Sequence, residues 1–447
     1  MSELIISVSG LRGIVGETLT PPVAIDFCAA FAAGLDEGPI VITRDGRATG
    51  AMLAGAIRGG LCAVGRDVID AGIAATPTTG VLVRQLHAAG GIQISASHNP
   101  PEYNGIKLFA PDGRVLPARL GEKVLQRYRD QQPAWQGHDQ IGSVSPCTDP
   151  ISEHLQRVLA TVDVERIRAR QFPVLLDSNH GAGSVLGRPL LEALGCRVTF
   201  LGDVPDGQFS HVPEPTAENL RAVSADVLAS HSVVGFCQDP DADRLALIDE
   251  QGRYVGEEYT LAVCLDHVLR RRSGTVVTNC ATSRMSQDIA ERHGGRFFRA
   301  AVGEANVVDV MQEQDAVFGG EGNGGPIDPR VGYVRDSFVG MALVLDAMAA
   351  RQLPLSELAD ELPRYEIHKT KIPLQRDKIR PALAALEKHF RDAEADHADG
   401  LRLDWPNKWL LVRASNTEPI VRAIAEAQTR QEAEQLCAVA ADVLAKT

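Results

Sequence analysis

The strongest constraint on the fold is a repeated alternation of short apolar runs with segments of helical spacing. The runs Pro39–Thr43, Phe172–Asp177 and Gly274–Asn279 have the length and the apolar character of buried strands. Each precedes a segment of helical spacing, which leads to another short apolar run. Strands and helices in alternation are typical of sheets covered by helices. Because 447 residues exceed what a single core accommodates, we expect several domains of this kind.

Domain boundaries follow from changes in this pattern. The polar stretch 131–150 has the composition of a linker, and the strand, helix, strand unit near 172–201 recurs near 274–300. We therefore predict three related α/β domains with mixed sheets, at residues 1–150, 151–255 and 256–368. We expect the remaining segment, 369–447, to form a smaller α+β domain whose helices lie outside an antiparallel sheet.

Composition excludes several classes of function. A formal charge of −13 argues against a nucleic-acid or anionic-membrane partner. No apolar run is long enough to span a bilayer, and Met1–Gly10 does not resemble a signal peptide, so we expect a cytoplasmic protein. The eight cysteines are scattered and none forms a Cys-x-x-Cys pair, which favours reduced thiols over a zinc site.

A polar loop after a predicted strand carries the first candidate for chemistry. The apolar run 91–94 is followed by the serine loop, residues 95–101, whose two prolines cannot continue a strand, and extended structure resumes near residue 106. Ser97, with His98 beside it and Lys107 shortly after, is a candidate nucleophile or phosphoryl carrier. A serine that only caps a turn is the alternative interpretation.

Three aspartates at alternate positions form a second candidate site. Asp239, Asp241 and Asp243 lie in the acidic loop, residues 239–244, which Pro240 stiffens and apolar runs bound. Like charges this close repel unless a cation joins them, and oxygen ligands suit Mg²⁺, so we expect a magnesium site. A solvated acidic turn is the alternative. We reject a calcium-binding loop because residues 245–248 indicate a strand rather than further ligands.

Three further segments have the composition of ligand-binding loops. In the glycine-rich loop, residues 319–326, five glycines surround Glu321 and Asn323, a pair suited to sugar hydroxyls, with a structural hairpin as the alternative. Near the N-terminus, Arg12 stands between glycines and could reach an anion. Residues 413–422 could surround a phosphate dianion or form a polar turn between strands. The candidates in that segment are Arg413, Ser415, Asn416, Thr417 and Arg422.

Together these segments resemble the α-D-phosphohexomutase superfamily. Ser-Ala-Ser-His-Asn-Pro at 95–100 is similar to its phosphoserine loop, and Asp-Pro-Asp-Ala-Asp-Arg at 239–244 is similar to its metal loop. Glu321 and Asn323 fall on its sugar-binding loop, and residues 413–422 fall on its phosphate-binding loop. The order and spacing of the four matches span nearly the whole chain.

The resemblance implies four domains around a central cleft and an isomerase that interconverts hexose 1-phosphates and 6-phosphates through a hexose 1,6-bisphosphate. It implies that Ser97 carries the phosphoryl group, with Mg²⁺ bridging it to the three aspartates. Lys107 would be a proton shuttle, with a pKa that is lowered if the closed cleft desolvates it near other cations, and Arg12 and Arg244 would contact phosphate. His98, next to Ser97, is counted with the catalytic residues.

Departures from the family pattern affect substrate recognition. Asn323 and Gly325 stand where serine and histidine are usual, and Ala414 and Asn416 replace a proline and a glycine. The segment 302–306 lacks a basic residue that many members carry. We expect a phosphoglucosamine mutase, with a phosphomannomutase or phosphoglucomutase as the alternative. There are two further alternatives. One is a phosphatase that forms the same phosphoserine but transfers its phosphoryl group to water, and the other is a non-catalytic sugar-phosphate sensor.

Overall fold

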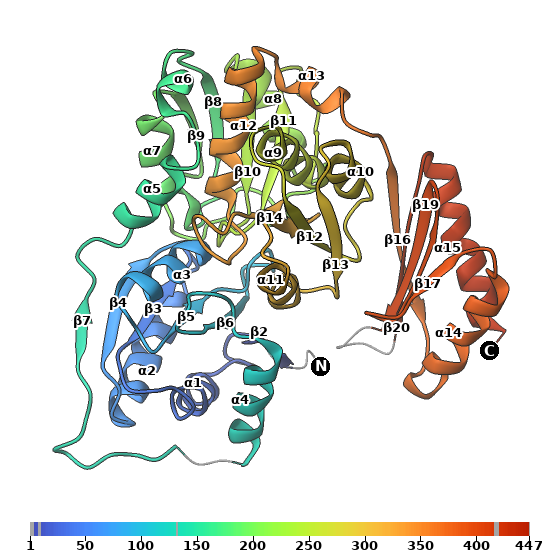
Figure 1. The fold of residues 1–447 in the computed structure, drawn as a ribbon. Coiled ribbons are helices and arrows are strands. Elements are labelled where there is room, and N and C mark those ends of the chain that lie inside the picture. Colours follow the sequence, from blue (N-terminus) through green and yellow to red (C-terminus); the bar gives the residue numbers. More distant parts are fainter. Residues whose placement is uncertain (1–3, 8–9, 131–132, 415–419, 447) are drawn as a thin grey trace.

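The computed structural model describes residues 4–7, 10–130, 133–414 and 420–446. Over these residues the chain forms four sheets, each accompanied by its own helices (Figure 1). Three sheets combine parallel and antiparallel pairs, and the fourth is antiparallel throughout. The predicted fold class, three related α/β domains followed by a smaller α+β domain, is confirmed.

The first domain is built on a seven-stranded sheet of order β1-β2-β6-β5-β3-β4-β7. Its elements are β1 (Ile5–Ser7), β2 (Gly10–Ile14), α1 (Pro21–Ala32), β3 (Ile40–Arg44), α2 (Gly50–Ala63), β4 (Val68–Ile73), α3 (Thr76–Gln85), β5 (Gly90–Ile94), β6 (Tyr103–Phe109), α4 (Ala118–Asp130) and β7 (Val144–Pro146). The strand β7 corrects the prediction of a plain linker at 131–150, because this segment pairs in parallel with β4 and extends the sheet.

The second and third domains each contain a four-stranded sheet. The second contains α5 (Ser152–Leu159), α6 (Val164–Arg168), β8 (Pro173–Asp177), α7 (Gly183–Ala193), β9 (Arg197–Leu201), α8 (Arg221–Ala229), β10 (Val234–Gln238) and β11 (Leu245–Asp249). The third contains α9 (Glu257–Arg271), β12 (Thr275–Asn279), α10 (Met285–Arg292), β13 (Arg296–Ala300), α11 (Glu304–Glu313), β14 (Phe318–Glu321), β15 (Gly325–Ile327), α12 (Ser337–Arg351) and α13 (Leu355–Asp360).

One strand arrangement recurs in the three sheets. The orders β4-β3-β5-β6, β9-β8-β10-β11 and β13-β12-β14-β15 each place three parallel strands beside one antiparallel strand. The hairpin that joins the third parallel strand to the antiparallel one is the serine loop in the first domain, the acidic loop in the second and the glycine-rich loop in the third. The three candidate loops therefore occupy equivalent positions in a repeated unit.

The second and third domains share a hydrophobic core. Val174 and Phe236 of the second sheet belong to the same buried cluster as Val276 and Phe318 of the third. The helix α12 runs between them and is buried almost along its whole length, in contact with α9 on one side and with α5, α6 and α7 on the other. This continuous packing holds the acidic loop and the glycine-rich loop in a fixed relation.

The C-terminal domain is a five-stranded antiparallel sheet of order β16-β20-β19-β18-β17. Its elements are β16 (Glu366–Pro373), the 3₁₀ helix η1 (Arg376–Lys378), α14 (Ile379–His389), β17 (Glu394–Asp396), β18 (Leu401–Trp405), β19 (Lys408–Ala414), β20 (Ile420–Ala427) and α15 (Arg430–Ala445). Both long helices pack on the sheet, and Figure 1 shows this domain standing apart from the first one. Among the described residues, no helix combines the length and the apolar character needed to cross a bilayer.

Candidate active site

The serine loop holds Ser97 in an unusual backbone conformation. Ser97 has a φ of 50°, in the left-handed region that residues other than glycine rarely adopt. Its backbone N–H donates to Ser95 Oγ at 2.9 Å, and Ser95 Oγ in turn donates to Asp45 Oδ2 at 2.6 Å. The Ser97 side chain is buried, with 1% of its surface exposed. The loop therefore presents one hydroxyl in a fixed place that is shielded from water.

Arg47 organises the serine loop, although the sequence pattern did not single it out. Its guanidinium donates to the backbone carbonyls of four residues of this loop and of the start of β6, at 2.5 to 2.9 Å. These acceptors are the carbonyl oxygens of Ser97, Asn99, Pro100 and Tyr103. Its Nε also donates to the buried carboxylate of Asp45 at 3.1 Å. One buried arginine thus determines the path of the loop.

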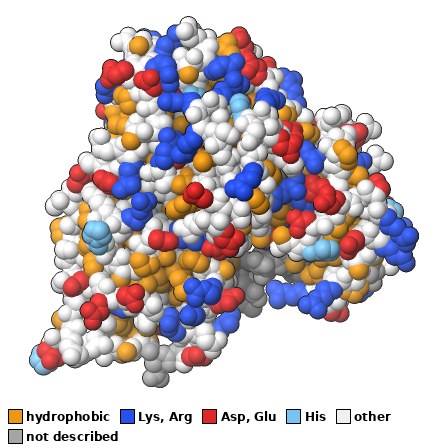
Figure 2. All heavy atoms as spheres, viewed as in Figure 1, with side chains coloured by type: hydrophobic (Ala, Val, Ile, Leu, Met, Phe, Trp, Pro, Cys, Tyr) orange, Lys and Arg blue, Asp and Glu red, His pale blue; other side chains and the backbone are white. Residues whose placement is uncertain are grey.

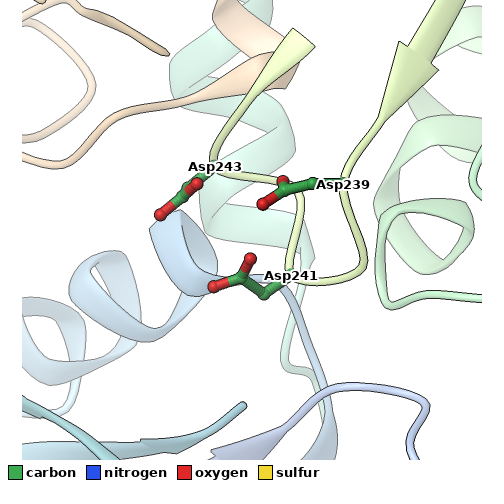
Figure 3. Close-up of side chains that lie close together, drawn as sticks. All are labelled: Asp239, Asp241 and Asp243. Carbon is green, nitrogen blue, oxygen red and sulfur yellow. The ribbon is translucent and has the colours of Figure 1, made fainter. Parts of the chain in front are cut away.

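The acidic loop brings its three carboxylates together. Asp239, Asp241 and Asp243 are all fully buried, and one oxygen of each lies within 4.8 Å of the others (Figure 3). The loop is anchored on both sides, because Ala182 N donates to Pro240 O at 2.7 Å and Thr76 Oγ1 donates to Asp241 Oδ2 at 2.6 Å. Packing from the first and second domains therefore fixes the carboxylates.

The donor set fits a divalent cation. In the described part of the chain, Asp241 Oδ1 and Asp243 Oδ1 are buried without any hydrogen-bond partner. Burial, reinforced by its two acidic neighbours, raises the pKa of Asp239 well above its usual range. Buried and unpartnered carboxylate oxygens carry a high energetic cost that a hard cation relieves. The solvated acidic turn, the alternative interpretation of this segment, is excluded by the burial of all three residues.

The serine loop and the acidic loop meet. Ser97 Oγ donates a hydrogen bond to Asp239 Oδ2 at 2.7 Å, although 142 positions separate the two residues. His98 Nδ1 lies 3.3 Å from the same Oγ. Burial and the charges of Arg244 and Arg12 lower the pKa of His98 to about 3, so this imidazole is neutral at physiological pH. A hydroxyl, a neutral imidazole and a cluster of carboxylates therefore surround one point.

Lys107 joins the site from the strand after the serine loop. Its Nζ donates to Asp241 Oδ2 at 2.6 Å and to Asp243 Oδ2 at 2.7 Å. The expected lowering of the Lys107 pKa is wrong for this arrangement. Burial alone would lower it, but the two carboxylates outweigh burial and raise the Lys107 pKa. The lysine is therefore a firmly held ammonium that neutralises part of the acidic loop.

Two arginines add positive charge near Ser97. Arg12 Nη1 donates to the Asn99 side chain at 3.2 Å, which places the N-terminal arginine against the serine loop. The backbone N–H of Arg244 donates to Asp239 Oδ1 at 3.1 Å. Both arginines contribute to the field that lowers the His98 pKa. The structure thus brings both predicted phosphate contacts to the same region as Ser97.

In the glycine-rich loop, Glu321 is buried and well oriented. Its Oε1 accepts hydrogen bonds from Asn279 Nδ2 at 2.6 Å and from Gly303 N at 3.1 Å. Its Oε2 accepts one from Arg335 Nη1 at 2.7 Å. Asn323 Oδ1 is buried without a partner among the described residues, so it is available as an acceptor. The sequence motifs do not indicate Arg335.

The C-terminal candidates are only partly described. Arg413 and Arg422 are paired residues of β19 and β20, and Arg413 Nε lies 2.8 Å from Asp399 Oδ2. Asp399 also accepts from Val302 N at 3.1 Å, next to the Gly303 that binds Glu321. The base of this segment therefore lies beside the glycine-rich loop. The remaining candidates lie outside the described residues: Ser415, Asn416 and Thr417.

Acidic and basic side chains are interspersed over the face shown in Figure 2. In Figure 1 the three hairpins that carry the candidate residues converge near the middle of the molecule.

Models of four domain families match the chain in order. Residues 4–134, 152–252 and 257–365 match the phosphoglucomutase/phosphomannomutase alpha/beta/alpha domains I, II and III, and residues 370–443 match the C-terminal domain of the same family. Together these models cover most of the chain.

Similar proteins give the same result. A phosphoglucomutase/phosphomannomutase of Thermococcus kodakarensis is 38% identical over 436 residues, with 95% of each chain covered. A probable phosphoglucosamine mutase of the same organism is 36% identical over 437 residues, covering 96% of this chain and 95% of the relative. The crystal structure of a family protein from Burkholderia thailandensis has a TM-score of 0.86, 27% identity and 98% coverage of both chains. The chain therefore belongs to the phosphoglucomutase/phosphomannomutase family and is an enzyme of the phosphohexomutase class.

Proposed function

We propose that this enzyme interconverts the 1-phosphate and 6-phosphate of a hexosamine or hexose through a phosphoserine at Ser97 and a sugar 1,6-bisphosphate. The hydrogen bond of 2.7 Å from Ser97 Oγ to Asp239 Oδ2 carries the proposal. It joins the hydroxyl that would carry the phosphoryl group to carboxylates suited to a cation. We take glucosamine phosphate as the preferred substrate, and mannose and glucose phosphates as the alternatives that the relative at 38% identity suggests.

The acidic loop would hold one Mg²⁺ ion through Asp239, Asp241 and Asp243, together with an oxygen on Ser97. When bound, the ion supplies positive charge to the oxygens of the transferred phosphoryl group. The fit rests on the two buried Asp oxygens that have no partner among the described residues.

Phosphoryl transfer would break the bond between Ser97 Oγ and phosphorus while a new bond forms from a sugar hydroxyl to the same phosphorus. The sugar hydroxyl loses its proton and Ser97 Oγ gains one, so the step balances. We assign movement of the sugar proton to Lys107. Because Lys107 is an ammonium paired with Asp241 and Asp243, it would first give a proton to the departing Ser97 Oγ, and the resulting amine would then take the proton of the sugar hydroxyl. Both pairs must loosen for this exchange.

The other candidates would bind and orient the substrate. Arg12 and Arg244 are cations beside the serine loop and the acidic loop, and would stabilise phosphoryl oxygens. Glu321 and Asn323 would accept hydrogen bonds from sugar hydroxyls. The second phosphate would bind at the C-terminal segment, through these residues: Arg413, Ser415, Asn416, Thr417 and Arg422. Burial of Ser97 favours transfer to sugar over transfer to water.

We place the enzyme in the cytoplasm, and we propose neither a nucleic acid nor a membrane as its partner. All eight cysteines are free, as expected for a reducing compartment.

Phosphorus NMR tests the proposal. The protein is incubated with Mg²⁺, a catalytic amount of glucose 1,6-bisphosphate, and the 1-phosphates of glucosamine, glucose and mannose in competition. We expect 6-phosphates to accumulate, glucosamine 6-phosphate first. Release of inorganic phosphate in place of isomer would indicate a phosphatase, and binding without conversion would indicate a sensor. Either result would contradict the proposal.

A further inference from the structure

Arg335 connects two of the three hairpin loops. It lies between β15 and α12, directly before Asp336, whose side chain caps α12. Its Nη2 donates to Asp243 Oδ2 in the acidic loop, and its Nη1 donates to Glu321 Oε2 in the glycine-rich loop, both at 2.7 Å. Its backbone N–H donates to Glu304 Oε1, also at 2.7 Å. Only 8% of the residue is exposed. One guanidinium therefore spans carboxylates from two domains.

Gly325 leaves the space that this side chain occupies. A Cβ atom at position 325 would lie 2.4 Å from Arg335 Cδ and 2.8 Å from Cγ, closer than real Cβ contacts allow. The φ of Gly325 is not in the left-handed region, so the backbone itself would accept alanine. A side chain at position 325 and the observed position of Arg335 therefore exclude each other.

Arg335 also determines what Glu321 can offer to a ligand. Among the residues that the structure describes, three groups donate hydrogen bonds to the Glu321 carboxylate, one of them this guanidinium. A carboxylate has about four acceptor directions, so one remains for a sugar hydroxyl.

We propose that Arg335 is a positioning residue that sets the sugar-binding carboxylate of Glu321 and ties it to Asp243 of the acidic loop, and that Gly325 is required to admit it. The proposal rests on the proposed function, because it assumes that Glu321 binds the sugar. In this arrangement the cation next to the glycine-rich loop is Arg335, which comes from the segment after β15. Glycine at position 325 leaves room for its side chain.

The first test separates geometry from charge. Arg335→Lys keeps the charge but replaces two nitrogen donors, one on Glu321 and one on Asp243, with a single ammonium on a shorter side chain, whereas Arg335→Gln removes the charge. Calorimetry measures the affinity of each variant for glucose 6-phosphate in EDTA and, separately, for Mg²⁺ alone. We expect both variants to bind glucose 6-phosphate at least about tenfold more weakly, the size expected for a charge-assisted hydrogen bond.

The two variants should differ in their affinity for Mg²⁺. Removing a cation beside Asp243 strengthens attraction for another cation, so Arg335→Gln should bind Mg²⁺ more tightly, while Arg335→Lys should bind it about as the wild type does. A variant that merely unfolds would lose both affinities, which thermal melts of each variant also check. The control is Arg330→Gln, which removes an arginine paired with Asp328 in the same segment. It should change neither affinity.

The second test moves Arg335 without replacing it. Gly325→Ala should displace the arginine and weaken glucose 6-phosphate binding as much as Arg335→Lys does. The double variant should bind no more weakly than either single variant, since both act through the same contact. Three results would overturn the proposal. They are an unchanged affinity for glucose 6-phosphate in Arg335→Lys, additive losses of that affinity in the double variant, and a folded Arg335→Gln that binds both glucose 6-phosphate and Mg²⁺ more weakly. Failure of the proposed function would show differently, as a wild-type enzyme that forms no isomer.

Discussion

Arg47 offers the sharpest test of how the fold prepares the serine loop. Arg47→Lys retains a positive charge next to Asp45 but replaces the planar fork that reaches four backbone carbonyls. If lysine keeps only the Asp45 pair and one carbonyl, three carbonyls lose their donor. At a net value of about 1 kcal/mol for each hydrogen bond, the loop loses about 3 kcal/mol. The left-handed conformation of Ser97 adds roughly 1 kcal/mol of strain that these bonds offset.

We therefore expect Arg47→Lys to lower the rate of isomerisation by at least about tenfold, because much of the enzyme no longer holds Ser97 in place. Steady-state assays with saturating bisphosphate measure the rate, and circular dichroism checks the fold. Arg66→Lys is the matched control, since Arg66 donates to three carbonyls in the same domain, at the end of α1 and just beyond it. It should leave the rate unchanged. Wild-type turnover in Arg47→Lys would refute the reasoning.

Three further predictions concern binding, pH and metal. Arg413→Ala should raise KM for the sugar phosphate more than it lowers kcat, and an unchanged KM would show that the C-terminal segment does not bind phosphate. Burial raises the pKa of Glu258 to about 8, so the folded state holds a proton that the unfolded state releases near 4.5. The stability that this group contributes is fully present below pH 4.5 and is lost as the pH rises toward 8. We therefore expect the Tm of Glu258→Gln to fall less between pH 5 and 8 than the Tm of the wild type does. EDTA should abolish isomerisation and added Mg²⁺ should restore it, whereas activity that survives chelation would contradict the assigned cation.

The fold was predictable where strands are short, apolar and bounded by turn residues. The predicted strand Pro39–Thr43 lies one residue from the bounds of β3 at each end, and the predicted strand, helix, strand units near 172–201 and 274–300 are present as β8, α7, β9 and as β12, α10, β13. Several helices were missed, α9 and α12 among them. The helix α12 is buried between two domains and is apolar on nearly every side, so it lacks the one-sided spacing by which a surface helix is recognised. The strand β7 was missed because three residues at the edge of a sheet leave little signal.

The candidate site was predictable where one segment carries several functional groups. Ser97 and the three aspartates stand out because their chemistry is local in sequence. Arg47 and Arg335 were missed because most of their partners lie far away in the sequence, up to 56 positions for Arg47 and up to 92 for Arg335. A signal for Arg47 existed nonetheless: β3 and β5 were both expected as strands, and parallel neighbours bring the loops that follow them to one edge.

The central claim is that the Ser97 hydroxyl stores the phosphoryl group between the two sugar positions. The most direct measurement incubates the enzyme with Mg²⁺ and glucose 1,6-bisphosphate labelled with ³²P, maps the labelled peptide by mass spectrometry, and then adds unlabelled glucose 1-phosphate. We expect label on Ser97 alone, none in Ser97→Ala, and transfer of that label to the sugar. Label on another residue, or its release as inorganic phosphate when the sugar is added, would contradict the account.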